Sequence, residues 1–490
     1  MAVPSVEASL QDTSRFLEVR VLSGFASHAI RTLSWIVFTT VLVLIAVLPF
    51  PYGAVQAWWT ALFEVIVFVA TILWIIHGLL SGSWFVKEHK VLIPLLAVVL
   101  FAFAQTIPLS SVPSTIRGLE ITRTISADPF ETKQFAKDFL AHTLLLAMLL
   151  RFTDSKYRLR ALTYVVIATG MTIAGFGLLR FVAQPQQGGF LLHYLKGETG
   201  FGPFINRNHF SFLMEMTLGL ISGLVIFAGL GPRKLRLFLA CAITIWLATS
   251  LSDSRGGILA LVCQIMLGFI LAMSVSHARI ARGYFRRVRR LAASSASLRA
   301  ATLITILIIV VAGTVWVGGD QLKYRVSMVP TEIGGDLEEN SVRRADIWKA
   351  GWLLFRAHPI AGSGFGGFSA AVTRYHEKAG NYSPHQAHND YLEILASGGV
   401  IGVALGLWFV FGMYRFVVAR LDTDSRFLQA ARWGAIIGVF GVAIHSFVEF
   451  GLHVPGNSVV FMALLAISMA DVRRKTRGSA RMSKHRLTAL

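Results

Sequence analysis

The chain has 490 residues, of which 54% are apolar and only 15% are charged. Soluble domains carry about 25% charged residues, so this composition excludes an ordinary soluble protein and predicts an integral membrane protein with many helices. The formal net charge of +20 would suit a nucleic-acid-binding protein. However, the basic residues cluster in short segments between apolar runs, as expected of cytoplasmic loops, so no nucleic-acid partner is expected.

Apolar windows of about 20 residues predict an all-α fold. Residues 1–31, which precede the first window, are of mixed polarity and are expected to lie in the cytoplasm. Twelve transmembrane helices are predicted near residues 32–50, 57–80, 91–109, 134–150, 161–183, 210–230, 235–252, 256–275, 300–318, 399–415, 432–449 and 457–471. Both cysteines, Cys241 and Cys263, fall inside apolar runs, so a disulfide framework is not expected.

Basic residues gather in the connections that follow every second predicted span, among them the run from Arg282 to Arg290, which is expected to contact anionic lipids. The alternate connections are poorer in basic residues, and 319–398 holds eight Lys plus Arg against nine Asp plus Glu. This alternation places both termini in the cytoplasm. It divides the chain into helices 1–9 (32–318), a large outer loop (319–398), helices 10–12 (399–471) and a basic cytoplasmic tail (472–490).

Four unusual polar clusters fall on the predicted outer side. They are Asn206–His209, Asp253–Gly257, the Arg343/Arg344 pair and the His385/His388 pair. Arg255 stands between two spans with almost no loop, and an arginine so close to hydrocarbon needs a partner or must reach water. It is therefore either an interfacial arginine that snorkels or an anion-binding group at the membrane surface.

The segment from Asn340 to Ala357 predicts an amphipathic helix capped by Asn340 or Ser341. Its expected apolar stripe consists of Ala345, Trp348, Trp352 and Phe355. Arg344 falls at the edge of this stripe and is expected to face the protein, whereas Arg343 faces water. Arg344 then either meets a specific anionic partner or stacks on Trp348 as a cation–π pair.

A helix is also predicted from Ser383 to Gly402, with Ser383 as its cap and with His385 and His388 on one face. His388 could be a structural histidine, a metal ligand or a catalytic base. A metal site is disfavoured because no third and fourth ligand of suitable spacing accompanies the pair, and no cofactor is expected. The one DxD-like triplet, residues 422–424, lies on the cytoplasmic side.

The glycines of the segment 362–367 could present backbone amides to a phosphate, but a tight structural turn is the favoured interpretation. Arginines and a histidine at a membrane surface, without metal-binding carboxylates, indicate one kind of reaction. A lipid-linked diphosphate leaves a carbon centre, arginines stabilise the developing charge, and a histidine accepts a proton from the attacking hydroxyl.

At these residues the chain resembles the O-antigen ligase family, which includes O-antigen ligases, O-antigen polymerases and protein O-oligosaccharyltransferases of bacterial envelopes. The first similar motif is His388-Asn389, followed after nine residues by Gly399-x-x-Gly402. The second is Arg344-x-x-x-Trp348, followed by His358-Pro359 and Gly362-x-Gly364. The other two are Ser254-Arg255-Gly256-Gly257 and Gly202-x-Phe204-x-Asn206-Arg207-Asn208. Together they cover roughly residues 200–405, and their order makes the match specific.

The resemblance implies a metal-independent, GT-C-like glycosyltransferase of the bacterial inner membrane, with a catalytic periplasmic loop at 319–398. It implies an undecaprenyl-diphosphate-linked glycan as donor, a glycan, lipid-core or protein hydroxyl as acceptor, and polysaccharide or lipopolysaccharide biosynthesis in the cell envelope. His388 would be the base, and Arg255 and Arg344 would hold the diphosphate. The further residues expected to bind substrate are Asn389, His385, Arg207, Asn208 and Arg343.

Two alternatives stay open. Ligation to a lipid core, polymerisation of repeats and protein O-glycosylation share these motifs. A polytopic transporter or lipid-linked glycan flippase is a second class of function, because twelve spans is a common transporter number and Glu64 lies well inside a span.

Overall fold

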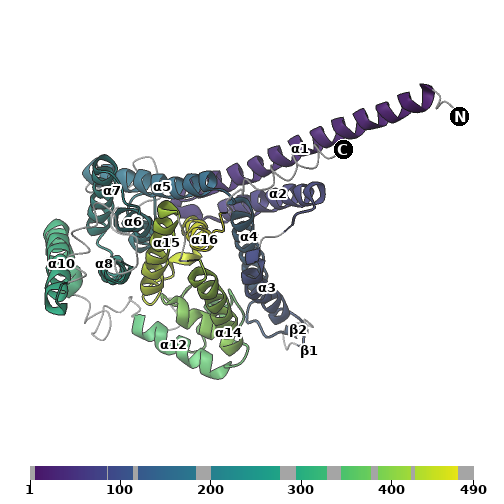
Figure 1. Cartoon of the computed structure of the whole chain (residues 1–490). Coiled ribbons are helices and arrows are strands. Elements are labelled where there is room, and N and C mark those ends of the chain that lie inside the picture. Colours follow the sequence, from purple (N-terminus) through teal and green to yellow (C-terminus); the bar gives the residue numbers. More distant parts are fainter. Residues whose placement is uncertain are drawn as a thin grey trace.

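The computed structural model describes residues 6–84, 87–113, 120–183, 200–275, 294–327, 344–376, 384–420 and 425–472. Most of these residues form helices that stand side by side in one bundle (Figure 1). The helices that coincide with the predicted spans are α1 (Val6–Val47), α2 (Ala57–Ser81), α3 (Ile93–Gln105), α4 (Pro129–Phe152), α5 (Lys156–Ala183), α6 (Arg207–Phe227), α7 (Pro232–Leu251), α8 (Arg255–Val275), α10 (Ala296–Ser327), α14 (Asp390–Val418), α15 (Arg426–His445) and α16 (Pro455–Met469).

Within the described residues, nine of these helices are long and apolar enough to cross a membrane. Of the others, α3 and α16 are shorter apolar helices, and α4 has 24 residues but begins with several charged ones. The prediction of an all-α polytopic membrane protein is therefore confirmed in its class. The assignment of all twelve as spans, and the sides on which the loops lie, stay predictions.

The shorter elements lie between these helices. They are the 3₁₀ turns η1 (Tyr52–Ala54), η2 (Lys87–Leu92) and η3 (Gly451–His453), the helices α12 (Arg344–Ala357) and α13 (Phe368–Val372), and the strands β1 (Ser110–Pro113) and β2 (Glu120–Arg123). The two strands form an antiparallel hairpin, a small exception to the all-α prediction.

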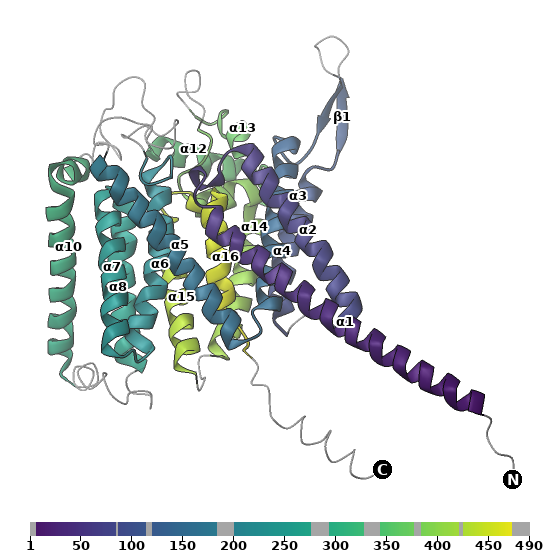
Figure 2. The same ribbon diagram turned by 90° about the horizontal axis from the view of Figure 1, so that it is seen from above.

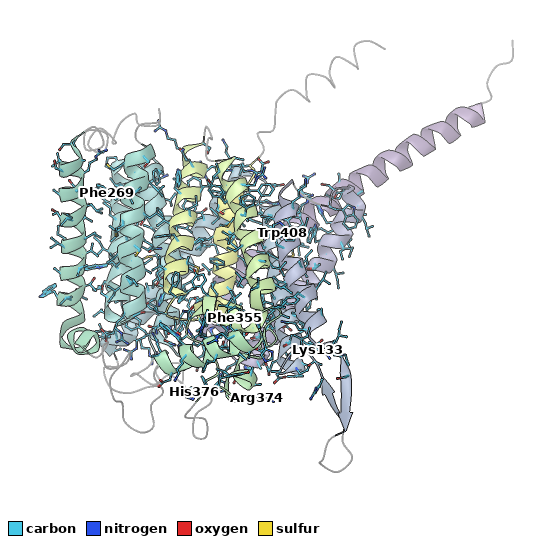
Figure 3. The ribbon with its side chains drawn as sticks, turned by 90° about the horizontal axis from the view of Figure 1, so that it is seen from below. Lys133, Phe269, Phe355, Arg374, His376 and Trp408 are labelled. Carbon is cyan, nitrogen blue, oxygen red and sulfur yellow. The ribbon has the colours of Figure 1, made fainter. Side chains whose placement is uncertain are left out.

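Figure 2 shows that the hairpin, α12 and α13 lie at one end of the bundle, which we call the α12 end, while α1 begins and α16 ends toward the opposite end. In Figure 3, Phe355, Arg374 and His376 mark the α12 end, and Trp408 of α14 lies in the body of the bundle. The Arg282–Arg290 run and the triplet 422–424 lie outside the described residues.

Helix α6 is the centre of the bundle. It is apolar on nearly all sides, and 78% of its most apolar window is buried, against 6% for α10 at the edge (Figure 1). A helix that is apolar all round is stable only when other helices or lipid surround it. Helices α5, α7, α8, α15 and α16 all pack against α6.

Helices α6 and α15 approach each other through glycines. A Cβ atom on Gly219 would lie 2.3 Å from the backbone nitrogen of Gly438, and one on Gly223 would lie 2.3 Å from the Cα of Gly434. Lipid supplies little hydrophobic driving force between helices, so close backbone contact through small residues is a main source of their association. This contact fixes the relative position of the two helices whose ends at the α12 end carry polar side chains.

The buried face of α12 differs from the predicted stripe. Its buried residues are Ile347, Ala350, Gly351 and Leu354, while Trp352 is 48% exposed. The prediction chose the largest aromatic side chains, but α14 comes so close that a Cβ atom on Gly351 would lie 3.2 Å from Leu392. Small and aliphatic residues fit this interface. The proposed caps, Asn340 and Ser341, lie outside the described residues.

The glycine contact between α6 and α15 should control stability. We expect Gly223→Leu to lower the stability of the purified protein by roughly 1–3 kcal/mol, because the side chain must push two backbones apart. Gly406→Leu is the matched control, since a Cβ atom there meets nothing within 4 Å. Thermal unfolding in detergent measures both. Equal melting temperatures for the two variants would contradict the assigned contact.

Candidate active site

A buried carboxylate connects the residues of the candidate site. Glu449 follows α15 and its side chain is 1% exposed. Its Oε1 lies 2.8 Å from Nδ1 of His388, and its Oε2 lies 3.3 Å from Nη2 of Arg344. Asn208 at the start of α6 donates from Nδ2 to the same Oε2 at 2.5 Å. Glu449 thus connects α6, α12 and the residues before α14 at the α12 end of the bundle.

The charge state of Glu449 follows from these contacts. Burial alone would raise the pKa of its carboxyl, but the hydrogen bond to His388 and the charges of His388, His209 and Arg344 lower that pKa to about 2. The group is therefore ionised at neutral pH. An ionised carboxylate only accepts hydrogen bonds, so Nδ1 of His388 carries the hydrogen in this contact.

In the tautomer that carries its single hydrogen on Nδ1, the His388 ring has a lone pair on Nε2 that can accept a proton. The His388 side chain is 27% exposed and that of Arg344 is 33% exposed, so a molecule at the surface can reach both. The two oxygens of Glu449 face different partners, with Oε1 toward the histidine and Oε2 toward the arginine. A base and a cation are thereby held next to each other by one carboxylate.

His388 does not belong to a helix, contrary to the prediction of a helix from Ser383. Helix α14 begins at Asp390, and Asn389 caps it by accepting a hydrogen bond from the amide of Leu392 at 3.1 Å. His388 has φ of 49°, a left-handed conformation that is uncommon for residues other than glycine. His385 and His388 therefore do not share a helical face, and His385 is exposed.

Several contacts hold His388 in this conformation. Nε1 of Trp348 donates to the carbonyl of Ala387 at 3.0 Å, and the amide of Ala387 donates to Glu393 at 2.8 Å. On the other side, the amide of Asp390 donates to the carbonyl of Ser446 at 3.0 Å. A strained residue persists only where its surroundings fix it, and such residues are often found at functional sites.

The glycines near the site allow backbone conformations and close contacts that a side chain would prevent. Gly399 has φ of 60° and ψ of −161° and interrupts α14. A Cβ atom on Gly399 would lie 2.4 Å from the carbonyl oxygen of Ile360. The amides of Ser363 and Gly364 donate to carbonyls at the Ala396–Ser397 turn of α14, so they are already used. The structural interpretation of the glycine-rich turn is confirmed.

A chain of hydrogen bonds runs from Glu449 to Ser254, the residue before Arg255. Ser254 donates to Oδ1 of Asn208 at 2.8 Å, and Asn208 in turn donates to Glu449. Arg255, the next residue, begins α8 and is half-buried. The start of α8 lies against the end of α15, because a Cβ atom on Gly256 would lie 2.3 Å from Nε2 of His445.

The structure sorts the predicted residues into three groups. His388, Arg344 and Asn208 all contact Glu449, and Arg255 is adjacent to Ser254 in that network. Arg207 forms an ion pair with Asp253 at 3.8 Å and Asn389 caps a helix, so each has a structural partner as well. His385 lies exposed in the loop before α14, and Arg343 lies outside the described residues.

Glu449 was not among the predicted site residues. Its signal in the sequence is modest, a single acid at the outer end of the eleventh predicted span. That position suits a charge at the interface equally well, so the sequence does not distinguish the two roles. Within the described ranges, no group of three or more His, Cys, Asp or Glu side chains could hold a metal ion.

The low pKa of Glu449 makes stability depend on pH. A carboxyl with a folded-state pKa of about 2 against an ordinary 4.5 adds on the order of 3 kcal/mol above pH 4.5, which is lost as the pH falls toward 2. Glu449→Gln removes this charge, so its melting temperature should lie below that of the wild type at pH 7 and approach it at pH 3. Exposed Glu131→Gln is the control. A gap for Glu449→Gln that is the same at both pH values would contradict the assigned pairing.

Part of the chain matches a known protein family. Residues 239–407 match a family model described as O-antigen ligase. The matched segment contains Arg255, Arg344 and His388, and it ends before Glu449. A search of curated proteins gave no match. The match agrees with the membrane helices of this segment. The match spans about a third of the chain and shows that this segment is similar to O-antigen ligases.

Proposed function

We propose that the protein transfers a glycan from an undecaprenyl-diphosphate-linked donor to an acceptor hydroxyl at the periplasmic face of the bacterial inner membrane. The observation that carries this proposal is Glu449, which holds a base, His388, and a cation, Arg344, on its two oxygens. A base and an anion-binding group side by side are what displacement of a diphosphate by a hydroxyl needs. The family match supports the same class of reaction.

In the proposed reaction, Nε2 of His388 accepts the proton of the acceptor hydroxyl as its oxygen forms a bond to the anomeric carbon. The bond from that carbon to the diphosphate oxygen breaks, and its electron pair stays on the diphosphate. Arg344 and Arg255 stabilise the negative charge that develops on this leaving group. The products are the glycosylated acceptor and undecaprenyl diphosphate.

Glu449 is a positioning residue in this mechanism. Its hydrogen bond to Nδ1 fixes the tautomer of His388 and orients its ring, and its charge stabilises the imidazolium that forms when Nε2 takes the proton. The same carboxylate neutralises part of the charge of Arg344 and holds it beside the base. Asn208, which donates to Glu449, then supports the site without contacting the reacting atoms.

Transport is the alternative function that the sequence left open. Glu64, the acid that suggested it, pairs with Lys137 of α4 at 3.0 Å. The buried Glu215 of α6 likewise pairs with His445 of α15 at 2.6 Å. Paired acids suit a stable bundle as well as a transport path. Glycan transfer by the purified protein in detergent, where no compartments exist, would exclude transport as the only activity.

The assigned roles predict the behaviour of three variants. We expect His388→Ala to lower the transfer rate by about 10²–10⁴-fold and Arg344→Ala or Arg255→Ala by about 10²–10³-fold, while each protein still accumulates in the membrane. The assay uses purified protein, undecaprenyl-diphosphate-linked glycan and candidate acceptors, in EDTA, where the wild type is expected to remain active. His358→Ala alters an exposed histidine at the end of α12 and is the control.

Full activity of His388→Ala would remove the base from the mechanism. If EDTA abolished transfer by the wild type and added divalent metal restored it, the metal-independent mechanism would be wrong, while the assignment to glycosyl transfer would stand.

The acceptor can be identified from cells that lack this protein. Loss of all attached glycan, with lipid-linked glycan accumulating, is expected for a ligase or a protein O-glycosyltransferase. Loss of chain length alone is expected for a polymerase. Electrophoresis of lipopolysaccharide and of glycoproteins, with extraction of the lipid-linked pool, separates these outcomes. An unchanged glycan profile would contradict the proposed function.

A further inference from the structure

The connection between α7 and α8 is short and has an unusual backbone. Helix α7 ends at Leu251 and α8 begins at Arg255, and both helices lie next to α6 (Figure 2). Between them, Asp253 has φ of 54°, a left-handed conformation that few residues other than glycine adopt. Such a conformation persists only where its surroundings fix it, and it often occurs at functional sites. The contacts around Asp253 therefore decide what this turn does.

Both neighbours of Asp253 are tied to α6. Oγ of Ser252 lies 3.1 Å from Oγ of Ser211, and Oγ of Ser254 donates to Oδ1 of Asn208 at 2.8 Å. Ser211 and Asn208 lie one turn apart near the start of α6, and both serines of the connection are buried. The connection is thus held against the first turns of α6 on each side of Asp253.

The first turn of α8 is enclosed by two helices. Ser254 caps α8, because its Oγ accepts a hydrogen bond from the amide of Gly257 at 3.2 Å. A Cβ atom on Gly257 would lie 2.7 Å from the side chain of Ser211 in α6. One on Gly256 would lie 2.3 Å from Nε2 of His445 in α15. The start of α8 thus fits between α6 and α15 with no room to shift toward either helix.

These restraints make the backbone of Asp253 decisive for Arg255. With Ser252 and Ser254 held, the φ of Asp253 sets the direction in which the chain leaves α7 and enters α8. A right-handed or extended φ at this residue would turn the following residues away from their contacts with α6. Arg255 is the first residue of α8, so its position follows the direction of that first turn.

The side chain of Asp253 has a contact of its own. Its Oδ2 lies 3.8 Å from Nη1 of Arg207, the first residue of α6, and the Asp253 side chain is 7% exposed. Glycine is the usual residue at a left-handed position after a helix, because it has no Cβ atom. Aspartate is one of the few other residues that visit this conformation, and unlike glycine it supplies a carboxylate. The backbone of the turn and the ion pair with Arg207 are therefore two separate contributions.

We propose that Asp253 is a positioning residue for Arg255, and that its left-handed backbone holds Arg255 where it binds the donor diphosphate. This inference rests on the proposed function, in which Arg255 stabilises the leaving group. It adds that the donor side of the site depends on the turn between two membrane helices. Asp253 itself, a carboxylate paired with Arg207, is not expected to contact the diphosphate, since like charges repel.

Binding of undecaprenyl diphosphate tests this role. The dissociation constant of the radiolabelled lipid is measured with purified full-length protein in detergent, so it depends neither on turnover nor on the amount of folded protein. We expect Asp253→Val to raise the dissociation constant about tenfold, because a β-branched residue strongly disfavours a left-handed φ. Asp253→Gly also lacks the carboxylate but adopts this φ freely, so its dissociation constant should stay within about threefold of the wild-type value.

A double-mutant cycle shows whether the effect passes through Arg255. Arg255→Ala alone should weaken binding of the lipid about tenfold or more. In the Arg255→Ala background, adding Asp253→Val should change the dissociation constant by less than about twofold, because the group that the turn positions is gone. Should Asp253→Val not accumulate in the membrane, Asp253→Ala provides the same comparison with an expected rise of about fivefold.

Three results would overturn the positioning role. An unchanged dissociation constant in Asp253→Val would leave the turn a structural element only, whatever the melting temperature of this variant. An equal rise in Asp253→Gly would assign the effect to the carboxylate, and an equal rise in the Arg255→Ala background would show that it bypasses Arg255. A wild-type protein that binds no undecaprenyl diphosphate and transfers no glycan would instead contradict the proposed function itself.

Discussion

The site depends on one buried charge. An ionised carboxylate away from water is stable only when cations and hydrogen-bond donors surround it, and Glu449 obtains these from His388, Arg344 and Asn208. The requirement brings three distant parts of the chain to one point. Removing any partner leaves a buried charge less well compensated, so these contacts serve folding. In the proposed mechanism the same contacts also orient His388 and Arg344, which would couple stability and activity at Glu449.

The membrane bundle supplies the rigid frame for that contact. Helices α6 and α15 meet through Gly219, Gly223, Gly434 and Gly438, which sets the distance between their ends at the α12 end. Asn208 stands at the start of α6 and Glu449 just past α15, so the spacing of these two helices determines whether their side chains meet. Helix α12 and the loop before α14 then close over the carboxylate. Close packing of small residues in the bundle is thus what allows precise polar contacts at its end.

The backbone conformation of His388 decides what its ring can reach. The left-handed φ at this residue brings the ring to Glu449, which also holds Arg344. If residues 383–402 formed one helix, as the sequence predicted, the side chain of His388 would project from that helix like those of the residues in the first turn of α14. The non-helical loop instead lets Asn389 cap α14 while His388 reaches Glu449.

The sequence by itself determined the fold class, the positions of the apolar helices and the glycine-rich turn, and it proposed His388, Arg344 and Arg255 as candidate site residues. These depend on local properties, namely apolar length, charge alternation and short spacings, which need no knowledge of distant residues. Only the tertiary structure decided the partner of His388, 61 residues away, and that of Arg344, 105 residues away. It also decided which face of α12 is buried and that His388 precedes its helix. Pairings across such separations are set by how the helices pack, and a single sequence carries no local mark of them.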